Sequence, residues 1–358
     1  MSEKIGVILL NLGSPASPSV PDVRRYLQEF LMDPCVLDIN PVGRALLVYG
    51  PISIFRSPKS AHAYDSVWMK NPGALNGSPL LHYSLSAAEK LKGHLDSKYQ
   101  VAVAMRYQNP SIEAALKAID VEQCSDLRVL PLYPQFALST TITAEMALRK
   151  ELKKFRFSGK LSFLKPFYDQ PDYISAQASR GQALWKSGDY DFVLFSFHGI
   201  PERHISRFSN SNSDCLQKSS CCDLSNSNDM DYCYRKQCYK NAALVAEKLG
   251  LRQDQWTVSF QSRLGRTPWI KPYTDFVLPE LLAKGKKRLL VYCPSFVADC
   301  LETLEEIAIR ERASFIDQGG AELKLVPSLN DSMEWTSALK NLISDSHRYC
   351  ETYQVRSI

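Results

Sequence analysis

A histidine ends an apolar run in the segment VLFSFHGIPERHI, which begins at Val193. The run is typical of a buried strand, and His198 marks the point where it becomes a loop rich in Gly, Pro, Glu and Arg. Imidazole titrates close to neutral pH, so it can accept and return protons. We expect His198 to act in catalysis, whereas His204 in the same loop is expected to bond to the backbone.

Three carboxylates follow a second apolar run, RLLVYCP, in the segment ADCLETLEEIAI. Asp299, Glu302 and Glu306 are spaced three and four residues apart, so an α-helix would place them on one face. Such a face is most often a solvated stripe. Here the helix directly follows a strand, and carboxylates in its first turns can bind a divalent cation or hold protons.

Other polar side chains could bind an acidic ligand, although each alone is typical of a surface or a helix cap. They are Arg56 in IFRSPKSAHAY, Ser78 in NGSPL, Tyr107 in MRYQNP and the LSTT run at 138–141. The segment PVGRALLVYGPISIF at 41–55 is apolar but broken by Gly and Pro. We interpret it as either a packed loop or an exposed apolar lip for a flat ligand or a bilayer.

Cysteine is unevenly distributed, because half of the 10 cysteines fall in one short segment. They are Cys215, Cys221, Cys222, Cys233 and Cys238. In a chain that shows no secretory start, this bunching favours metal binding over disulfides. The spacings are looser than those of zinc ribbons, whereas iron-sulfur clusters tolerate such gaps. The thiols could therefore bind zinc, hold a cluster or stay reduced.

The composition excludes several classes of protein. It is 45% hydrophobic and 23% charged with a net charge of +5, which is typical of a globular protein. The charges are scattered, without a basic stripe for nucleic acid. No apolar run approaches the roughly 20 residues of a membrane span, and the start MSEK resembles no targeting sequence. Glycine-rich nucleotide fingerprints are missing. We expect a cytoplasmic protein, with peripheral contact to the inner membrane as an option.

The elements that position these side chains repeat one pattern: an apolar run, a loop rich in Pro, Gly, Ser or Asn, then an amphipathic helix. Four segments show it, at 5–31, 127–155, 191–250 and 288–313. Further strands are predicted in YQVAVAMRY, LSFLKPFY, WTVSFQS and ELKLVPSL. The alternation predicts parallel βαβ units, whose ligands lie beyond the carboxyl ends of the strands.

The chain is expected to form two doubly wound domains, because 358 residues exceed the usual size of one core. The first spans 1–155. The second spans 156–330 and carries His198, the cysteine-rich insertion 209–238 and the helix of Glu302. A helix within 331–350 is expected to pack back on the first domain. The strand-end loops should face a common cleft with His198 at its mouth.

Seven motifs resemble those of the ferrochelatases, in order, from about Ile5 to Val326. They are LLNLGSP, RSPKSAHAY, GSPLLHYS, LPLYPQFALSTT, FSFHGIPERHI, SFQSRLGRTPWIKPYTD and CPSFVADCLETLEEI. The resemblance implies the chelatase-like α/β fold, two Rossmann-like domains with parallel four-stranded sheets and the porphyrin in the cleft between them. It also implies a lyase of heme biosynthesis that inserts Fe²⁺ into protoporphyrin IX, the terminal step, forming protoheme.

The resemblance assigns roles to particular residues. His198 matches the family's active-site imidazole, Glu302 its catalytic glutamate and Asp299 a nearby acidic partner. The iron substrate is implied at His198, Glu302 and Glu306. Porphyrin contacts are implied at Leu12, Gly13, Arg56, Ser78, Tyr107 and Trp269.

The chain departs from the commonest family pattern in the cysteine-rich insertion and at two single positions. Some bacterial ferrochelatases carry a 2Fe-2S cluster on an insertion at this place. The resemblance therefore implies a cluster here, on Cys215, Cys222, Cys233 and Cys238, with Cys221 as an alternative. Arg310 stands where some relatives continue an acidic ladder, and Cys300 stands where a His is frequent.

Two alternative functions remain open. One is a chelatase for another tetrapyrrole such as coproporphyrin III, and the other is a non-catalytic porphyrin-binding or iron-sulfur sensor protein. The apolar segment 41–55 favours the more hydrophobic protoporphyrin, and the presence of both His198 and Glu302 argues against a loss of catalysis. The expected partners are protoporphyrin IX and Fe²⁺ and no nucleic acid, with the oligomeric state open.

Overall fold

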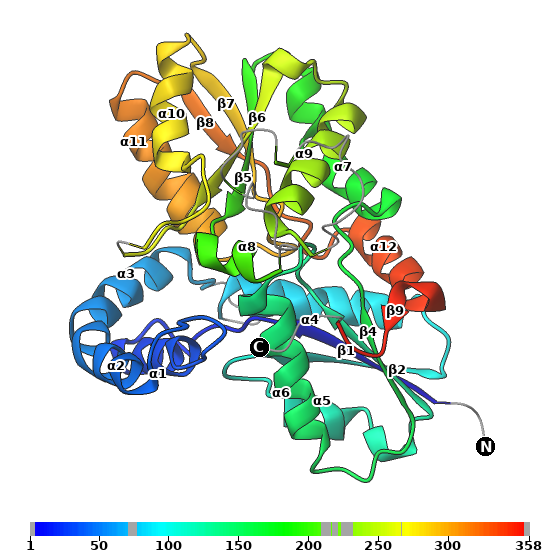
Figure 1. The fold of residues 1–358 in the computed structure, drawn as a ribbon. Helices are drawn as coiled ribbons and strands as arrows, with labels where there is room; N and C mark the ends of the chain where they lie inside the picture. Colours follow the sequence, from blue (N-terminus) through cyan, green and yellow to red (C-terminus); the bar gives the residue numbers. More distant parts are fainter. Residues whose placement is uncertain are drawn as a thin grey trace. The chain divides into compact units, whose positions relative to one another are not determined.

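The structure, a computed structural model, describes residues 4–70, 77–208, 216, 221–222, 232–265 and 267–353. The chain divides into two compact units, whose elements are drawn in Figure 1. Unit 1 comprises Met1–Tyr133, Leu138–Lys165 and Asn330–Gln354. Unit 2 comprises Pro134–Ala137, Pro166–Leu329 and Val355–Ile358.

Unit 1 is built on a five-stranded sheet in the order β2-β1-β3-β4-β9. The strands are β1 (Ile5–Asn11), β2 (Tyr99–Met105), β3 (Asp126–Pro131), β4 (Lys160–Leu164) and β9 (Tyr349–Cys350). The first four are parallel, and β9 pairs with β4 in the antiparallel direction. The central strand β1 is buried at every residue, as expected of a parallel strand covered on both faces.

The helices of unit 1 cover both faces of this sheet. They are α1 (Val20–Leu31), α2 (Pro41–Leu47), η1 (Val48–Arg56), α3 (Ser57–Val67), α4 (Pro79–Lys92), α5 (Ile112–Ala118), η2 (Val121–Gln123), η3 (Leu138–Ile142), α6 (Thr143–Leu152), α12 (Met333–Ser344) and η6 (Ser346–Arg348). Helix α12 packs on α4, and α5 packs on α6 on the opposite face of the sheet (Figure 1). Serine side chains cap the first turns of α1, α5 and α12 by accepting backbone N–H bonds.

Unit 2 contains a four-stranded parallel sheet in the order β6-β5-β7-β8. Its strands are β5 (Phe192–His198), β6 (Trp256–Gln261), β7 (Arg288–Tyr292) and β8 (Glu322–Leu325). In sequence order this is the arrangement of the four parallel strands of unit 1, with the first strand between the second and the third. Both units are therefore doubly wound sheets of one topology.

The helices of unit 2 also lie on two faces of their sheet. They are α7 (Pro171–Lys186), α8 (Glu202–Phe208), α9 (Tyr234–Leu249), η4 (Gln253–Gln255), α10 (Thr274–Ala283), η5 (Glu302–Glu311) and α11 (Arg312–Asp317). Helices α7 and α9 pack together on one face, and α10 and α11 lie on the other (Figure 1). Helix α9 ends at Gly250, which adopts a left-handed conformation with φ of +71°.

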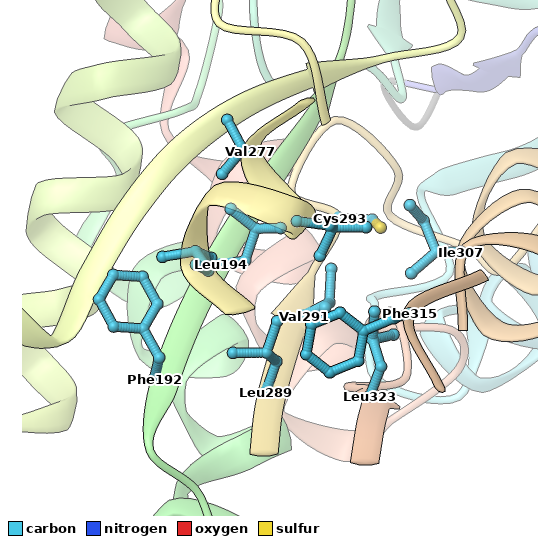
Figure 2. Packing of buried hydrophobic residues seen from close by; sticks show 11 residues of the cluster. Phe192, Leu194, Val277, Leu289, Val291, Cys293, Ile307, Phe315 and Leu323 are labelled. Atoms are coloured by element: carbon cyan, nitrogen blue, oxygen red, sulfur yellow. The ribbon is translucent and has the colours of Figure 1, made fainter. Parts of the chain in front are cut away.

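An apolar cluster fixes η5 and α11 against the sheet of unit 2. Figure 2 shows Ile307 of η5 and Phe315 of α11 beside Leu289 and Val291 of β7. Ile307 and Val291 are completely buried, so the register of η5 on the sheet is set by close packing. The first turn of η5 is consequently held near the carboxyl end of the strands.

The eight strands predicted from the sequence are confirmed, with two differences in the architecture around them. The sheet of unit 1 has a fifth strand, because the two-residue strand β9 adds to its edge. The helix predicted in CLETLEEIAIRERA is a π-helix over Glu302–Glu311 that continues as α11. No helix within the described residues is long and apolar enough to cross a membrane.

The segment 41–55 forms α2 and most of η1, a π-helical segment kinked at Gly50. Ser53 stabilises the kinked part, because its hydroxyl donates to the Val48 carbonyl oxygen at 2.7 Å and accepts from the Gln28 side chain at 2.8 Å. The large apolar side chains of the segment are nevertheless exposed. They are Val42, Leu46, Leu47, Tyr49, Ile54 and Phe55, with exposed fractions of 38% to 71%. We call this set the apolar lip.

Candidate active site

His198 is the last residue of β5, and the register of the unit 2 sheet determines its place. It pairs with Gln261 at the end of β6, so both side chains lie at the carboxyl edge of the sheet. A Cβ on the next residue, Gly199, would lie 2.8 Å from the Gln261 carbonyl oxygen and 3.2 Å from the Trp269 ring. A glycine is needed because the loop turns so closely over β6.

The imidazole of His198 is oriented by one hydrogen bond and two aromatic neighbours. Its Nδ1 lies 2.5 Å from the Gly199 carbonyl oxygen, which can only accept, so Nδ1 carries a proton and in the neutral ring Nε2 has the lone pair. The rings of Trp269 and Phe296 have centroids 6.3 and 6.1 Å from that of His198. Within the described part of the chain, Nε2 has no hydrogen-bond partner. The half-buried ring thus presents a proton-accepting nitrogen.

Two hydroxyl groups hold the backbone of His198. The Tyr234 hydroxyl donates to the His198 carbonyl oxygen at 2.7 Å. The Ser295 Oγ accepts from the His198 N–H at 3.2 Å and lies 2.9 Å from the Tyr234 hydroxyl. Both side chains come from elements far from His198 in the sequence, the start of α9 and the loop after β7.

Gln261 links His198 to the first turns of η5. Its Nε2 donates to the Glu302 carbonyl oxygen at 2.8 Å and lies 3.2 Å from Glu306 Oε2. Its Oε1 accepts from the buried hydroxyl of Ser196 at 2.8 Å. Because Gln261 is also the strand partner of His198, His198 and Glu302 lie at the same edge of the unit 2 sheet.

Glu306 is already occupied by protein donors. Its carboxylate accepts from the Ser262 N–H at 2.9 Å and from the Ser262 hydroxyl, and Arg310 pairs with it at 3.2 Å. The neighbouring Glu311 is partly buried, and burial together with Glu306 raises its pKa above the usual range, although Arg310 opposes the shift. The row of carboxylates along η5 is therefore interrupted at Arg310, which pairs with Glu306.

Asp299 does not share a helical face with Glu302 and Glu306, so the predicted α-helical face of three carboxylates is wrong. It lies before η5, is 5% exposed, and accepts from the Thr303 hydroxyl and the Ser328 N–H, each at 3.1 Å. These bonds hold Asp299 at the base of η5. They make its carboxylate a support for the helix that carries Glu302 and Glu306.

Two buried thiols stand close to these carboxylates. Burial raises the pKa values of Cys293 and Cys300 well above the usual range, and the neighbouring carboxylates add to the shift. Both are therefore protonated at neutral pH. The Cys300 thiol interacts with the Glu302 carboxylate, and because it is protonated it can only donate to that carboxylate.

In unit 1, the Leu12–Gly13 turn is packed against the backbone of Tyr107. Gly13 has a φ of +112°, and a Cβ there would lie 2.0 Å from the Tyr107 carbonyl oxygen. The Tyr107 N–H donates to the Leu12 carbonyl oxygen at 2.9 Å. Only glycine fits this conformation and this approach, so the turn is rigidly placed at the carboxyl end of β1.

The Tyr107 side chain belongs to a buried ionic network. Its hydroxyl donates to Asp33 at 2.9 Å, and the same carboxylate accepts from Arg106, Thr143 and the Cys35 N–H. Burial opposes ionisation of Asp33, but these donors outweigh it and lower its pKa. Tyr107 is 0% exposed, which differs from the predicted direct contact with a porphyrin.

The remaining predicted contact residues have different environments. Arg56 is exposed at the last residue of η1, whereas Ser78 is 3% exposed at the N-cap of α4. Leu12 is half-buried. Trp269 is half-buried too, and its indole N–H donates to the Leu264 carbonyl oxygen at 2.9 Å. Arg56, Leu12 and Trp269 thus have surface that a ligand could reach.

Four of the five bunched cysteines are described, and Cys215 lies outside the described residues. The Sγ atoms of Cys221 and Cys222 are 3.8 Å apart, and the Cys222 thiol hydrogen-bonds with that of Cys233. Arg235 points its guanidinium at Cys222, with Nη1 3.1 Å from the sulfur. Among the described residues, no group of three or more His, Cys, Asp or Glu side chains is arranged to hold a metal ion.

Several residues that hold these side chains were not predicted from the sequence: Gln261, Tyr234 and Ser295 in unit 2, and Asp33 in unit 1. Gln261 carried a usable signal, because it is a polar side chain at the end of the apolar strand WTVSFQ, as His198 is in its own strand. Ser295 carried a similar signal, because it lies in the loop after β7. Tyr234 and Asp33 follow no strand and act through contacts distant in sequence. No pattern within one segment could have singled them out.

Comparisons with known proteins extend over almost the whole chain. The family model described as Ferrochelatase matches residues 4–347. The chain is 48% identical over 338 residues to a ferrochelatase of Stutzerimonas stutzeri strain A1501, covering 94% of this chain and 97% of that one. It is 44% identical over 345 residues to a ferrochelatase of Coxiella burnetii strain CbuG_Q212, covering 96% and 94%.

Solved structures share the fold at low sequence identity. SirB from Bacillus subtilis with Fe³⁺ matches with a TM-score of 0.54 at 11% identity, covering 95% of this chain and 94% of that chain. The sirohydrochlorin chelatase SirB from Bacillus subtilis subspecies spizizenii, in complex with cobalt, matches with a TM-score of 0.51 at 11% identity and the same coverage. At these identities the likeness establishes the chelatase-like fold alone.

Proposed function

The chain belongs to the ferrochelatase family, and from this premise we propose that His198 and Glu302 carry its reaction and that protoporphyrin IX is its porphyrin. Its activity is the insertion of Fe²⁺ into a porphyrin, the terminal step of heme biosynthesis. The observation that carries the assignment of residues is the junction at Gln261, which brings the end of β5 and the start of η5 to one edge of one sheet.

The reaction requires a base, because a free porphyrin carries two pyrrole protons that must leave as the metal enters. His198 is suited to this role since its Nδ1–H is committed to the Gly199 carbonyl oxygen and its Nε2 keeps a lone pair. An imidazole can receive a proton near neutral pH and release it again. We assign the first proton acceptance to His198 Nε2.

Glu302 is the carboxylate best placed to act with His198. Its main chain is tied to Gln261, and its carboxylate keeps acceptor capacity beyond the Cys300 thiol. It can hold a proton passed from the imidazole or supply an oxygen ligand to the incoming Fe²⁺. Glu306 and Asp299 accept bonds from Ser262 and Ser328, so we assign them to orienting η5, with Glu306 as a second iron-contacting oxygen.

The choice of protoporphyrin IX rests on apolar surface. The apolar lip of unit 1 exposes Leu46 at 70% and Phe55 at 71%, and the cations Arg56 and Lys59 follow it. A macrocycle with vinyl and methyl groups matches such a surface better than one with four carboxylates, because each buried carboxylate needs a partner. On unit 1 we propose Leu12, Gly13 and Ser78 as further porphyrin contacts, with Tyr107 supporting the Leu12–Gly13 turn. On unit 2 we propose Trp269 as a contact.

The apolar lip also supports peripheral membrane contact of a cytoplasmic protein, since large exposed apolar patches mark interaction surfaces. Replacing Leu46 and Phe55 together by Ser should lower the fraction of protein that sediments with liposomes. Unchanged sedimentation would remove the membrane from this proposal.

For the cysteine segment, which we define as Cys221, Cys222, Cys233 and Cys238, we propose a 2Fe-2S cluster on four ligands, Cys215, Cys222, Cys233 and Cys238, with Cys221 as the alternative to Cys222. Cys222 contacts Cys221 and Cys233 and interacts electrostatically with Cys238, and the Arg235 guanidinium favours the negative charge of thiolate ligands. A cluster would supply a cross-link that orders this polar part of the chain. Visible absorbance retained in full by Cys233→Ser would contradict the proposal.

The decisive experiment is anaerobic incubation with Fe²⁺ and either protoporphyrin IX or coproporphyrin III, followed by heme absorbance, for the native chain and for His198→Ala. We expect fast metallation of protoporphyrin IX by the native chain and a rate lower by about 10²-fold or more in the variant. A preference for coproporphyrin III would assign the alternative substrate. Equal rates for both proteins would remove His198 from the mechanism, and no metallation at all would indicate a non-catalytic binding protein.

A further inference from the structure

Tyr234 connects two parts of unit 2, because it is the first residue of α9 and its hydroxyl bonds to the backbone of His198. Its hydroxyl donates to the His198 carbonyl oxygen at 2.7 Å and lies 2.9 Å from Ser295 Oγ. Ser295 in turn accepts from the His198 N–H at 3.2 Å. Both polar groups of the His198 peptide backbone are thereby held by this pair of hydroxyls.

The other side of Tyr234 faces the cysteine segment. Cys233 is the N-cap residue of α9, and Cys238 lies one turn into the helix on the same face as Tyr234. The Cys238 thiol interacts electrostatically with the Tyr234 phenol, and the Cys222 thiol with that of Cys233. All three α9 residues are buried, with exposed fractions of 2%, 5% and 0% for Cys233, Tyr234 and Cys238.

We propose that Tyr234 is a positioning residue that couples the cysteine segment to His198. The inference deepens the proposed function, since it takes His198 as the imidazole of the reaction. It does not depend on which group the thiols hold, because free thiols, a soft metal ion and a cluster would each set the start of α9 differently.

The coupling follows from how completely Tyr234 is engaged. A buried hydroxyl that loses its partners is costly, so the start of α9 and the His198 backbone must move together or break a bond. The shift reaches the ring of His198 because its Nδ1 is tied to the carbonyl of the next residue, Gly199. By reciprocity, a ligand that fixes the position of His198 must also change how readily the thiols react.

The test compares native protein with Tyr234→Phe, which keeps the ring and removes the hydroxyl. The first readout is the steady-state metallation of protoporphyrin IX. We expect kcat to fall about tenfold, which corresponds to the net free energy of one such hydrogen bond. KM for the porphyrin should stay within about twofold of the native value. A role confined to stability would leave kcat per folded molecule unchanged.

The second readout is the rate at which iodoacetamide labels Cys233 and Cys238 in the purified full chain, with and without saturating protoporphyrin IX. In the native protein we expect bound porphyrin to change the labelling rate by at least about fivefold. In Tyr234→Phe we expect this ratio to fall to one. The ratio measures coupling directly and needs no turnover.

Tyr239→Phe is the matched control. Tyr239 lies on the same helix, and its hydroxyl accepts from Arg235 at 3.2 Å on the thiol side. We expect this variant to keep both the native kcat and the native labelling ratio. Ser295→Ala serves as a second test variant if Tyr234→Phe folds poorly by circular dichroism, and it should lower kcat and weaken the porphyrin effect.

The outcomes separate this inference from the proposed function. If the native chain metallates porphyrin but porphyrin leaves its labelling rates unchanged, the coupling is absent and the inference is overturned. The same holds if Tyr234→Phe keeps the native ratio and the native kcat, or if Tyr239→Phe loses them equally. A native chain that metallates no porphyrin overturns the proposed function instead.

Discussion

The carboxyl ends of the two parallel sheets use polar side chains in opposite ways, although the strand order is the same. In unit 1, Asp33, Arg106, Tyr107 and Thr143 bond to one another and are largely withdrawn from solvent. In unit 2, half-buried His198 and Glu302 are each tied through backbone groups, and acceptor atoms of both side chains remain available.

The difference shows that two sheets of one topology can serve structural support in one unit and chemistry in the other. A saturated ionic network in a low-dielectric interior is rigid but has no capacity left for protons or ligands. A side chain held through its backbone or through one of its two polar ends keeps the other end reactive. We therefore interpret the end of the unit 1 sheet as a support for the Leu12–Gly13 turn and that of unit 2 as the place of the chemistry.

The largest effect that would test this contrast is on turnover. Glu302→Gln should lower kcat for heme formation by about 10²- to 10³-fold with KM for porphyrin little changed, because the amide can neither hold a proton nor offer a charged ligand. Steady-state kinetics under anaerobic conditions would measure it. Glu305→Gln, a neighbouring carboxylate on η5, is the control and should remain near native activity.

The next effect is on stability and concerns unit 1. Asp33→Asn should lower the free energy of unfolding by about 3 kcal/mol at neutral pH, because it leaves the half-buried Arg106 without its anion. Since the pKa of Asp33 is lowered in the folded state, its stabilisation is full above its unfolded-state pKa of about 3.9 and is lost as the pH falls through the folded value. Chemical denaturation of the native chain and the variant at pH 7 and near pH 3 would measure this, and the difference between their free energies of unfolding should be smaller near pH 3.

The control for Asp33 is an ionic network at the surface. Glu113 pairs with Lys117 at 2.6 Å and with Lys154 at 2.9 Å, and its side chain is 37% exposed. Glu113→Gln should leave the denaturation curve nearly unchanged, because solvent screens such pairs. Equal losses from Asp33→Asn and Glu113→Gln would contradict the picture of a buried support.

The smallest predicted effect concerns the thiol beside Glu302. Cys300→Ala removes one hydrogen-bond donor and should lower kcat about three- to tenfold, whereas Cys300→Ser keeps a donor and should restore most of the rate. Comparing kcat for the two variants measures the contribution of the donor itself. A Ser variant as slow as the Ala variant would assign the effect to packing.

Much of the fold was predictable because the signals are local. Apolar runs such as IGVILLN and VLFSFH are buried strands, and α1 and α9 lie where helices were expected, whereas the short helix α8 after β5 was not predicted. Strand β9 was missed because two residues carry no periodicity, and the π-helix η5 was predicted as an α-helix because ETLEEIAIRE suits either backbone. The bond from the Ser328 N–H to Asp299 could not be predicted, because the two residues are remote in sequence.

The sequence by itself determined where the strands lie along the chain, the family and the types of reactive side chain. Each of these depends on residues that are contiguous or regularly spaced. Tertiary structure alone decided which polar atoms are committed and which are available. Tyr107 is directed to Asp33, Glu306 to Ser262, and Tyr234 to His198, by packing of segments far apart in the chain. A hydrogen bond depends on distance and direction in space, which no pattern along the chain encodes.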